Sequence, residues 1–229
     1  MIEKTTIFVI NLEARTDRRR DMARELARAG LNAEFFPAIR PADPADFPSL
    51  GAHGCFLSHL EVLKRAVSLN CHIAVLEDDV NFHREFRVLW PRALRELPAD
   101  WSIFYPAHQE RGLDAGMIKV DPGHAIRCTH FVLLNASIIG RLITGLEAIL
   151  QRPAGHPLGG PMHVDGAYST IRAQNPDLST FVFSPSLGYQ RSSRSDIEGQ
   201  KFFDRYRFLG PGVSAVRRLK ASVAKGLGG

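Results

Sequence analysis

The feature that most constrains the fold is residues 73–80, where a short apolar run passes directly into three consecutive carboxylates. Such a run is typical of a strand buried on both faces of a sheet, as in α/β proteins. Three adjacent acids at its end would repel one another, and a hard divalent cation is the simplest neutralising partner. The alternative is a solvated acidic turn, because one acid-x-acid pair is a weak signal. Glu77 and Asp79 are therefore the candidate metal ligands.

The chain has 229 residues, of which 45% are hydrophobic and 23% charged, as in one ordinary globular domain. Three scattered cysteines without a CxxC pair argue against a disulfide framework and against a zinc site, and they fit a reducing compartment. No apolar run suits a signal peptide or a membrane span, so we expect a cytoplasmic protein. The net charge of +5 is compatible with anionic substrates or a membrane surface and gives no indication of nucleic-acid binding.

The first forty residues predict a β-α-β unit. They read as a buried strand, a helix and a second strand, and this order favours a parallel sheet. In such sheets ligands sit beyond the carboxyl ends of the strands. The side chains expected at that edge are Asn11, Arg15 and Arg18, although arginines of a first helical turn can also form a solvated face.

Apolar periodicity predicts the elements that follow. We expect helices over residues 53–70, 86–97, 136–150 and 166–173, and strands over residues 102–105, 125–134 and 180–183. Small residues open the first of these helices, where an anion can approach the helix N-terminus closely. Ser58 and His59 lie in that stretch, and each taken singly is more often a hydrogen-bonded core residue than a ligand.

Residues 1–210 are expected to form a single domain, and residues 211–229 a basic amphipathic helix. This helix either packs on the domain or makes peripheral contact with an anionic membrane, such as the cytoplasmic face of an inner membrane. Its basic side chains are Arg217, Arg218, Lys220 and Lys225.

Five short blocks occur in an order that resembles glycosyltransferase family 25, which includes bacterial lipooligosaccharide galactosyltransferases and collagen galactosyltransferases. The resemblance extends over residues 7–197, nearly the whole expected domain. At His163 this chain departs from the family, which often has proline there. The blocks are Ile10-Asn11-Leu12 with Arg15, Asp17 and Arg18; Gly54-Cys55-Phe56-Leu57-Ser58-His59; Leu76-Glu77-Asp78-Asp79-Val80; His163-Val164-Asp165; and Ser195-Asp196-Ile197.

The resemblance implies a GT-A-like nucleotide-sugar-binding fold, an α/β domain with a mostly parallel central sheet flanked by helices. It also implies a UDP-sugar donor, with galactose as the expected sugar, and Mn²⁺ or Mg²⁺ at Glu77 and Asp79. The acceptor is expected to be an oligosaccharide or glycolipid in the synthesis of lipopolysaccharide or another surface glycan. The residues assigned to the donor, by this resemblance and by their charge, are Asn11, Leu12, Arg15, Arg18, Ser58, His59, Arg191, Arg194 and Asp196.

An inverting glycosyl transfer needs one group that accepts the proton of the acceptor hydroxyl. Asp165 is the first choice, because the preceding residues 155–161 are rich in glycine and proline and suit a mobile lid. Asp78 and His163 are the alternatives. Capping of the helix over residues 166–173 is the competing structural role of Asp165.

Two other functions stay open on the sequence. A catalytically silent nucleotide-sugar-binding protein would keep the same fold, and a sugar nucleotidyltransferase would also use an acidic metal site. The nucleotidyltransferase normally requires a glycine-rich phosphate loop after the first strand, and residues 11–17 contain no glycine.

Overall fold

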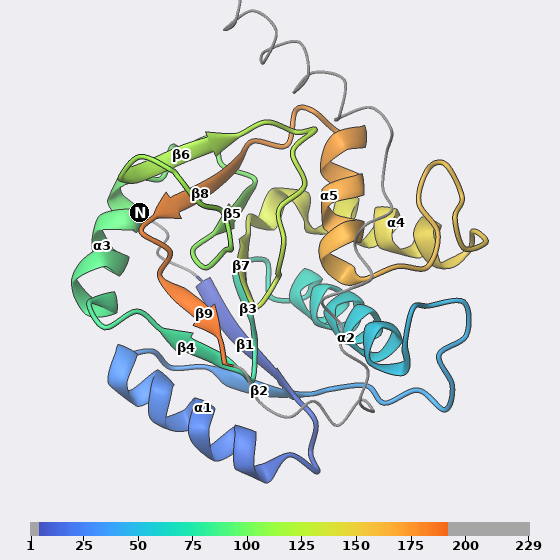
Figure 1. Cartoon of the computed structure of the whole chain (residues 1–229), viewed down its shortest axis with the longest axis horizontal. Helices are drawn as coiled ribbons and strands as arrows, with labels where there is room; N and C mark the ends of the chain where they lie inside the picture. The colour runs from blue at the N-terminus through green and yellow to red at the C-terminus, as the bar shows by residue number, and fades with distance from the viewer. Residues whose placement is uncertain (1–4, 192–229) are drawn as a thin grey trace, which may run out of the picture. The chain divides into compact units, whose positions relative to one another are not determined.

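Residues 5–191 are described by a computed structural model of the chain, in which helices cover both faces of a central sheet (Figure 1). The predicted donor residues Arg194 and Asp196 and the predicted basic helix near the C-terminus lie outside this range. Among residues 5–191, no helix combines the length and the hydropathy that crossing a membrane requires.

The central sheet has seven strands in the order β2-β1-β3-β7-β5-β8-β6. Five strands run in one direction, whereas β6 and β7 are antiparallel to their neighbours. The predicted α/β fold with a mostly parallel sheet is therefore confirmed. The strands are β1 (Thr5–Asn11), β2 (Glu34–Pro37), β3 (His72–Glu77), β5 (Ile103–Tyr105), β6 (Gly116–Val120), β7 (Phe131–Leu134) and β8 (Thr180–Ser184), and a separate antiparallel pair is formed by β4 (Val80–Phe82) and β9 (Gly188–Gln190).

Alternating side chains divide the core between the two faces of the sheet. In β1, for example, Phe8 and Ile10 join the apolar cluster under α2, α4 and α5, while Val9 joins the cluster under α1 and α3. Both faces are covered, which explains why the strands read as continuous apolar runs. The helices are α1 (Thr16–Ala29), α2 (Leu50–Val67), α3 (Phe86–Glu96), α4 (Ile139–Leu150) and α5 (Val164–Gln174), with a short 3-10 turn, η1 (Ala136–Ile138), before α4.

The structure corrects several of the predicted boundaries. The helix expected over residues 53–70 is α2, Leu50–Val67, which begins three residues earlier because Ser49 caps its first turn, and it also ends three residues earlier. The strand expected over residues 125–134 begins only at Phe131, and Cys128 just before it has a positive φ of 71°, which a continuing strand does not allow. Helix α5 begins at Val164, with His163 at the N-cap position. Asp165 therefore lies inside the first turn, and the prediction that it caps the helix is wrong.

Candidate functional site

The predicted site residues meet at the edge of the sheet where β1 and β3 end. Asn11 is the last residue of β1 and Glu77 the last of β3. Because β7 is antiparallel to β3, its beginning lies at the same edge, and the amide of Glu77 donates to the carbonyl of His130 at 3.0 Å. The chain thus brings strand ends that are distant in sequence to one place.

Glu77 faces polar groups from α2 and from the segment before β7. Its Oε1 accepts from the Thr129 hydroxyl at 3.5 Å and lies 3.8 Å from the Cys55 thiol. Burial first, and then the charges of Asp79, Asp78 and Asp165, together raise the pKa of Glu77 to about 8. A carboxyl in this setting gains most from a cation, which would stabilise its charged form.

Asp79 is almost completely buried and only partly hydrogen-bonded. Its Oδ2 accepts from Gln190 Nε2 at 3.2 Å and lies 3.6 Å from an Arg18 nitrogen. Its Oδ1 has no hydrogen-bond partner among the described residues. Burial raises the pKa of Asp79, an effect that Gln190 and Arg18 oppose. The unpartnered oxygen and the neighbouring carboxylate of Glu77 form a donor set that fits Mn²⁺ or Mg²⁺, since both ions prefer oxygen ligands.

The third acid of the block, Asp78, has a different role. Asn11 Nδ2 donates to its Oδ2 at 2.7 Å, and Arg18 donates to its Oδ1 at 3.0 Å. Both carboxylate oxygens are thus engaged by residues from β1 and α1. This arrangement ties the start of α1 to the end of β3 and uses the acceptors that a general base would need.

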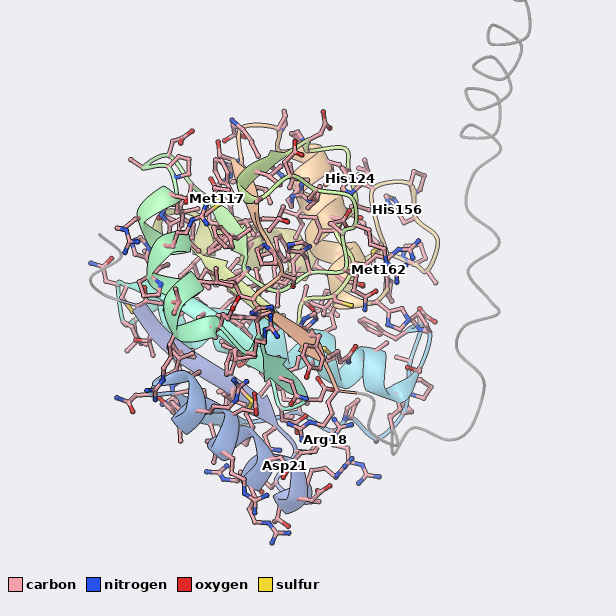
Figure 2. The ribbon with its side chains drawn as sticks, turned by 60° about the vertical axis from the view of Figure 1, so that its left-hand side comes forward. Arg18, Asp21, Met117, His124, His156 and Met162 are labelled. Atoms are coloured by element: carbon pink, nitrogen blue, oxygen red, sulfur yellow. The ribbon has the colours of Figure 1, made fainter. Side chains whose placement is uncertain are left out.

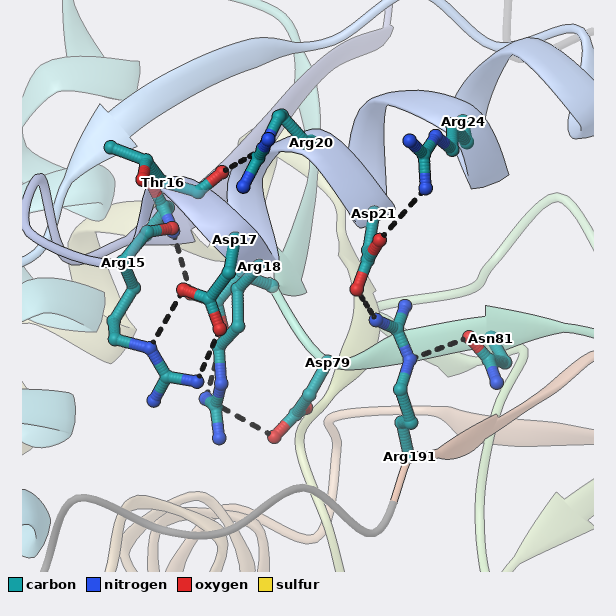
Figure 3. A network of polar contacts seen from close by, with 12 residues as sticks. Arg15, Thr16, Asp17, Arg18, Arg20, Asp21, Arg24, Asp79, Asn81 and Arg191 are labelled. Carbon is teal, nitrogen blue, oxygen red and sulfur yellow. Dashed lines mark hydrogen bonds and ion pairs between the residues drawn. The ribbon is translucent and has the colours of Figure 1, made fainter.

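The other arginines at this edge are held by acids of the first helix (Figure 3). Arg15 makes two parallel hydrogen bonds to Asp17, of 2.9 and 2.8 Å. Arg191 donates to Asp21 at 2.8 Å and to Asn81 Oδ1 at 3.0 Å. Its amide also donates to the Asp79 carbonyl at 2.7 Å, which fixes the end of β9 beside the acidic block.

Arg18 and Asp21, both on α1, lie at the opposite end of the described unit from Met117 and His124 (Figure 2). The arginine-rich end therefore coincides with the sheet edge that carries the acids, and the loops around β6 are remote from it. Leu12 is in the turn between β1 and α1, where its carbonyl accepts from the Arg15 amide at 2.8 Å.

Two pairs of residues on α2 have different roles, and the members of each pair lie one helical turn apart. Ser58 donates to the Gly54 carbonyl at 2.6 Å and accepts from the Ile39 amide at 2.8 Å. A Cβ on Gly54 would meet the Ile39 carbonyl oxygen at 2.6 Å, so only glycine allows this contact. Gly54 and Ser58 therefore hold the segment after β2 against α2, and this contact gives Ser58 a structural role.

The second pair on α2, Cys55 and His59, belongs to the acidic site. The ligand atoms of Cys55, His59 and Glu77 all lie within 4.8 Å of one another. His59 is fully buried, and burial lowers its pKa to about 4, so the imidazole is neutral at physiological pH. Burial, together with the charges of Glu77 and Asp165, raises the pKa of the Cys55 thiol.

Asp165 lies close enough to Glu77 for their charges to interact. Its oxygens accept from the Gly166 amide at 2.8 Å and from the Cys128 amide at 3.3 Å. The backbone amides at the first turn of α5 favour a negatively charged group, so this position suits a carboxylate side chain. His163, at the N-cap of the same helix, makes no side-chain capping bond.

Three residues at this site were not singled out from the sequence: Cys55, Thr129 and Gln190. The i, i+4 spacing of Cys55 and His59 was a visible signal, since it places both on one helical face. Thr129 and Gln190 gave no local signal, because only the antiparallel entry of β7 and the β4–β9 pairing bring them to Glu77 and Asp79.

Known proteins similar to this chain point to one family. The model of glycosyltransferase family 25, described as an LPS biosynthesis protein, matches residues 4–48 and 47–112. A "Glycosyltransferase 25 family member" of Anopheles gambiae is 36% identical over 103 residues, covering 35% of this chain and 17% of the relative. Human "Procollagen galactosyltransferase 2" is 29% identical over 243 residues, covering 86% of this chain and 38% of the relative.

This chain thus spans well under half of these relatives. Among solved structures, a Drosophila galactosyltransferase 7 in complex with manganese, UDP-Gal and xylobiose has a TM-score of 0.44 and 12% sequence identity, covering 88% of this chain and 77% of that one.

Proposed function

Residues 4–112 carry the signature of glycosyltransferase family 25, which confirms the resemblance, and on that premise we propose that the chain transfers a sugar from a UDP-sugar donor to a carbohydrate acceptor. Galactose is the proposed sugar, because curated relatives are named galactosyltransferases.

One observation carries the proposal: a buried, incompletely neutralised group of carboxylates at the end of β3. Glu77 and Asp79 have pKa values raised by burial, and Asp79 Oδ1 lacks a partner among the described residues. A purely structural cluster would be expected to satisfy such atoms, because an unpaired buried polar group costs about 1–3 kcal/mol. Perturbed carboxyls at a sheet edge are what a ligand site in an α/β fold requires.

Glu77 and Asp79 would hold Mn²⁺ or Mg²⁺, an ion that supplies Lewis-acid stabilisation of the leaving diphosphate when it is bound. One Arg18 nitrogen lies 3.0 Å from Asp78 Oδ1 and 3.6 Å from Asp79 Oδ2, which places a positive charge beside the acidic site. Asn11 adds a buried Oδ1 without a partner among the described residues, which can accept a hydrogen bond from the donor.

Asp165 is the proposed base. Two backbone amides hold its carboxylate at the first turn of α5, close enough to Glu77 for their charges to interact, so it is the carboxylate from a separate element that lies beside the proposed metal ligands. Asp78 is a weaker candidate, because one of its two hydrogen bonds comes from the cationic Arg18 and the other, from Asn11, is only 2.7 Å long, whereas Asp165 accepts from two neutral amides, one of them at 3.3 Å.

For the acceptor we propose an oligosaccharide or glycolipid of a surface glycan, in line with the description of the family model. A cytoplasmic location with peripheral contact to an anionic membrane remains part of this proposal, supported by the net charge of +5 and the basic residues near the C-terminus.

The decisive experiment measures UDP release from a panel of UDP-sugars, with Mn²⁺, with Mg²⁺ and with EDTA. Metal-dependent release from one sugar supports the transferase, even when water is the only acceptor. Tight UDP binding without any release would instead identify a silent nucleotide-sugar-binding protein. Equal UDP affinity with metal and with EDTA, measured by calorimetry, would contradict the roles of Glu77 and Asp79.

A further inference from the structure

Cys55, His59 and Glu77 form a cluster that differs chemically from the carboxylates beside it. Cys55 and His59 project from the same face of α2, one turn apart, toward the last residue of β3. Their sulfur, nitrogen and oxygen atoms all lie within 4.8 Å of one another, the only such group of three metal-ligating side chains within residues 5–191. The scattered cysteines argue against a zinc site when only their spacing is considered, but the fold supplies the other two ligands.

The imidazole of His59 has an open coordination position. Its Nδ1 lies 3.3 Å from the hydroxyl of Tyr168, while its Nε2 is buried and has no hydrogen-bond partner among the described residues. A proton on Nδ1, donated to Tyr168, leaves the Nε2 lone pair for an ion. Metal-binding histidines usually show this arrangement, in which the second ring nitrogen is fixed by a neighbouring oxygen.

The donor atoms determine which ions can bind. A thiolate, an imidazole and a carboxylate are ligands of Zn²⁺ and of similar ions, whereas Mg²⁺ prefers oxygen alone. Tetrahedral zinc with bonds of about 2.0–2.3 Å holds its ligand atoms roughly 3.3–3.8 Å apart. The Cys55 sulfur and Glu77 Oε1 are already 3.8 Å apart, and no pair of the three ligand atoms is more than 4.8 Å apart, so each pair lies within about 1 Å of a zinc geometry.

We propose that Cys55, His59 and Glu77 bind one thiophilic divalent ion of the zinc class. The Cys55 thiol loses its proton to solvent as the sulfur–metal bond forms, and three protein ligands leave a fourth position for water. This site shares Glu77 with the oxygen-ligand site for Mn²⁺ or Mg²⁺, so the two ions compete. The inference goes beyond glycosyl transfer, and its test needs no sugar donor.

The test uses Co²⁺ as a spectroscopic substitute for Zn²⁺ on the metal-free full chain. A cobalt–thiolate bond gives a near-ultraviolet charge-transfer absorption, which we expect at one equivalent of Co²⁺. Zn²⁺ should displace Co²⁺ at a stoichiometric concentration, whereas Mg²⁺, which competes only for Glu77, should need a large excess. Cys55→Ser removes a direct ligand and should abolish the absorption. It should also weaken Zn²⁺ binding by at least about 100-fold, because losing only an indirect partner of a metal ligand can already cost up to that much.

Cys71→Ser is the matched control, because Cys71 is buried at the opposite end of β3 and contacts Thr6. It should keep the absorption. No absorption in the wild-type chain, or the full absorption in a folded Cys55→Ser variant, would overturn the proposal. A second measurement needs no variant: Zn²⁺ should slow alkylation of Cys55, read by peptide mass mapping, at least tenfold. An unchanged rate would contradict the site even if the variant failed to fold.

Discussion

Two buried polar clusters in this molecule differ in how completely their hydrogen bonds are made. The guanidinium of Arg172, which is fully buried, donates to Thr180 Oγ1 at 2.9 Å and to the carbonyls of His124 and Asp121 at 3.0 Å each. At the end of β3, by contrast, Asp79 Oδ1, His59 Nε2 and Asn11 Oδ1 have no partner within residues 5–191.

The difference separates a structural cluster from a ligand site. All three guanidinium nitrogens of Arg172 donate to oxygens that the fold itself provides, so these bonds stabilise the loop before β7. Around Glu77 the fold buries charge and leaves acceptors open, which lowers stability unless something else binds. The predictions below test this contrast.

The largest effect is expected at Asp79. Asp79→Ala removes the carboxylate with the open oxygen, and UDP release should fall by about 100-fold or more, the usual scale for a key electrostatic group. UDP affinity should also lose its dependence on Mn²⁺, as measured by calorimetry with and without EDTA. The exposed Asp114→Ala is the control and should leave both quantities unchanged. Wild-type activity in Asp79→Ala would remove Asp79 from the site.

The next largest effect is expected for Asp165→Asn. If Asp165 is the base, transfer should fall by about 100-fold while donor and metal affinity stay nearly constant, because the amide oxygen can still accept from one of the two backbone amides. Steady-state kinetics and calorimetry on the same preparation separate the outcomes. Near-normal transfer would leave Asp165 a purely structural role, and a loss of donor binding would place it on the donor side.

For the cluster around Arg172 we expect an effect on stability alone. Arg172→Met leaves two buried carbonyls without a donor and should lower the free energy of unfolding by about 2 kcal/mol, measured by urea denaturation. Arg141→Met is the matched control: its ion pair with Asp177 is exposed and should contribute within about 0.5 kcal/mol. Loss of UDP affinity in folded Arg172→Met protein would contradict the separation of the two clusters.

The smallest effect concerns pH. Burial raises the pKa of Glu77 to about 8 in the folded, metal-free protein, against about 4.5 in the unfolded chain. Protonated Glu77 therefore stabilises the fold at low pH, and this contribution is lost as the pH rises through about 8. Glu77→Gln should flatten the decline of the free energy of unfolding between pH 5 and 8, by on the order of 1 kcal/mol per pH unit.

The comparison is made in EDTA, and Mn²⁺ should restore stability to the wild-type chain at pH 8 but not to Glu77→Gln. An identical pH dependence in both proteins would show that Glu77 is not buried as a carboxyl.

The sequence by itself determined the elements whose signals are local. The apolar run of β3, the carboxylates at its end and the helical periodicity of α2 are patterns of neighbouring residues, and each appears in the structure, with α2 three residues earlier at both ends than predicted. The order of five blocks gave the family, because spacing along the chain survives when overall similarity is low.

Only the tertiary structure decided which of the three acids have both carboxylate oxygens hydrogen-bonded and which do not. The acid-x-acid spacing separates Glu77 and Asp79 from Asp78 as candidate ligands, but it does not say what each contacts: Asn11 and Arg18 bind Asp78, while Asp79 Oδ1 has no partner among the described residues. Likewise, Cys55 becomes part of the site, and Ser58 takes its structural role, through contacts with strands and segments 19 to 22 residues away. Hydrogen bonding and burial depend on what the fold places opposite a side chain, and no local pattern contains that information.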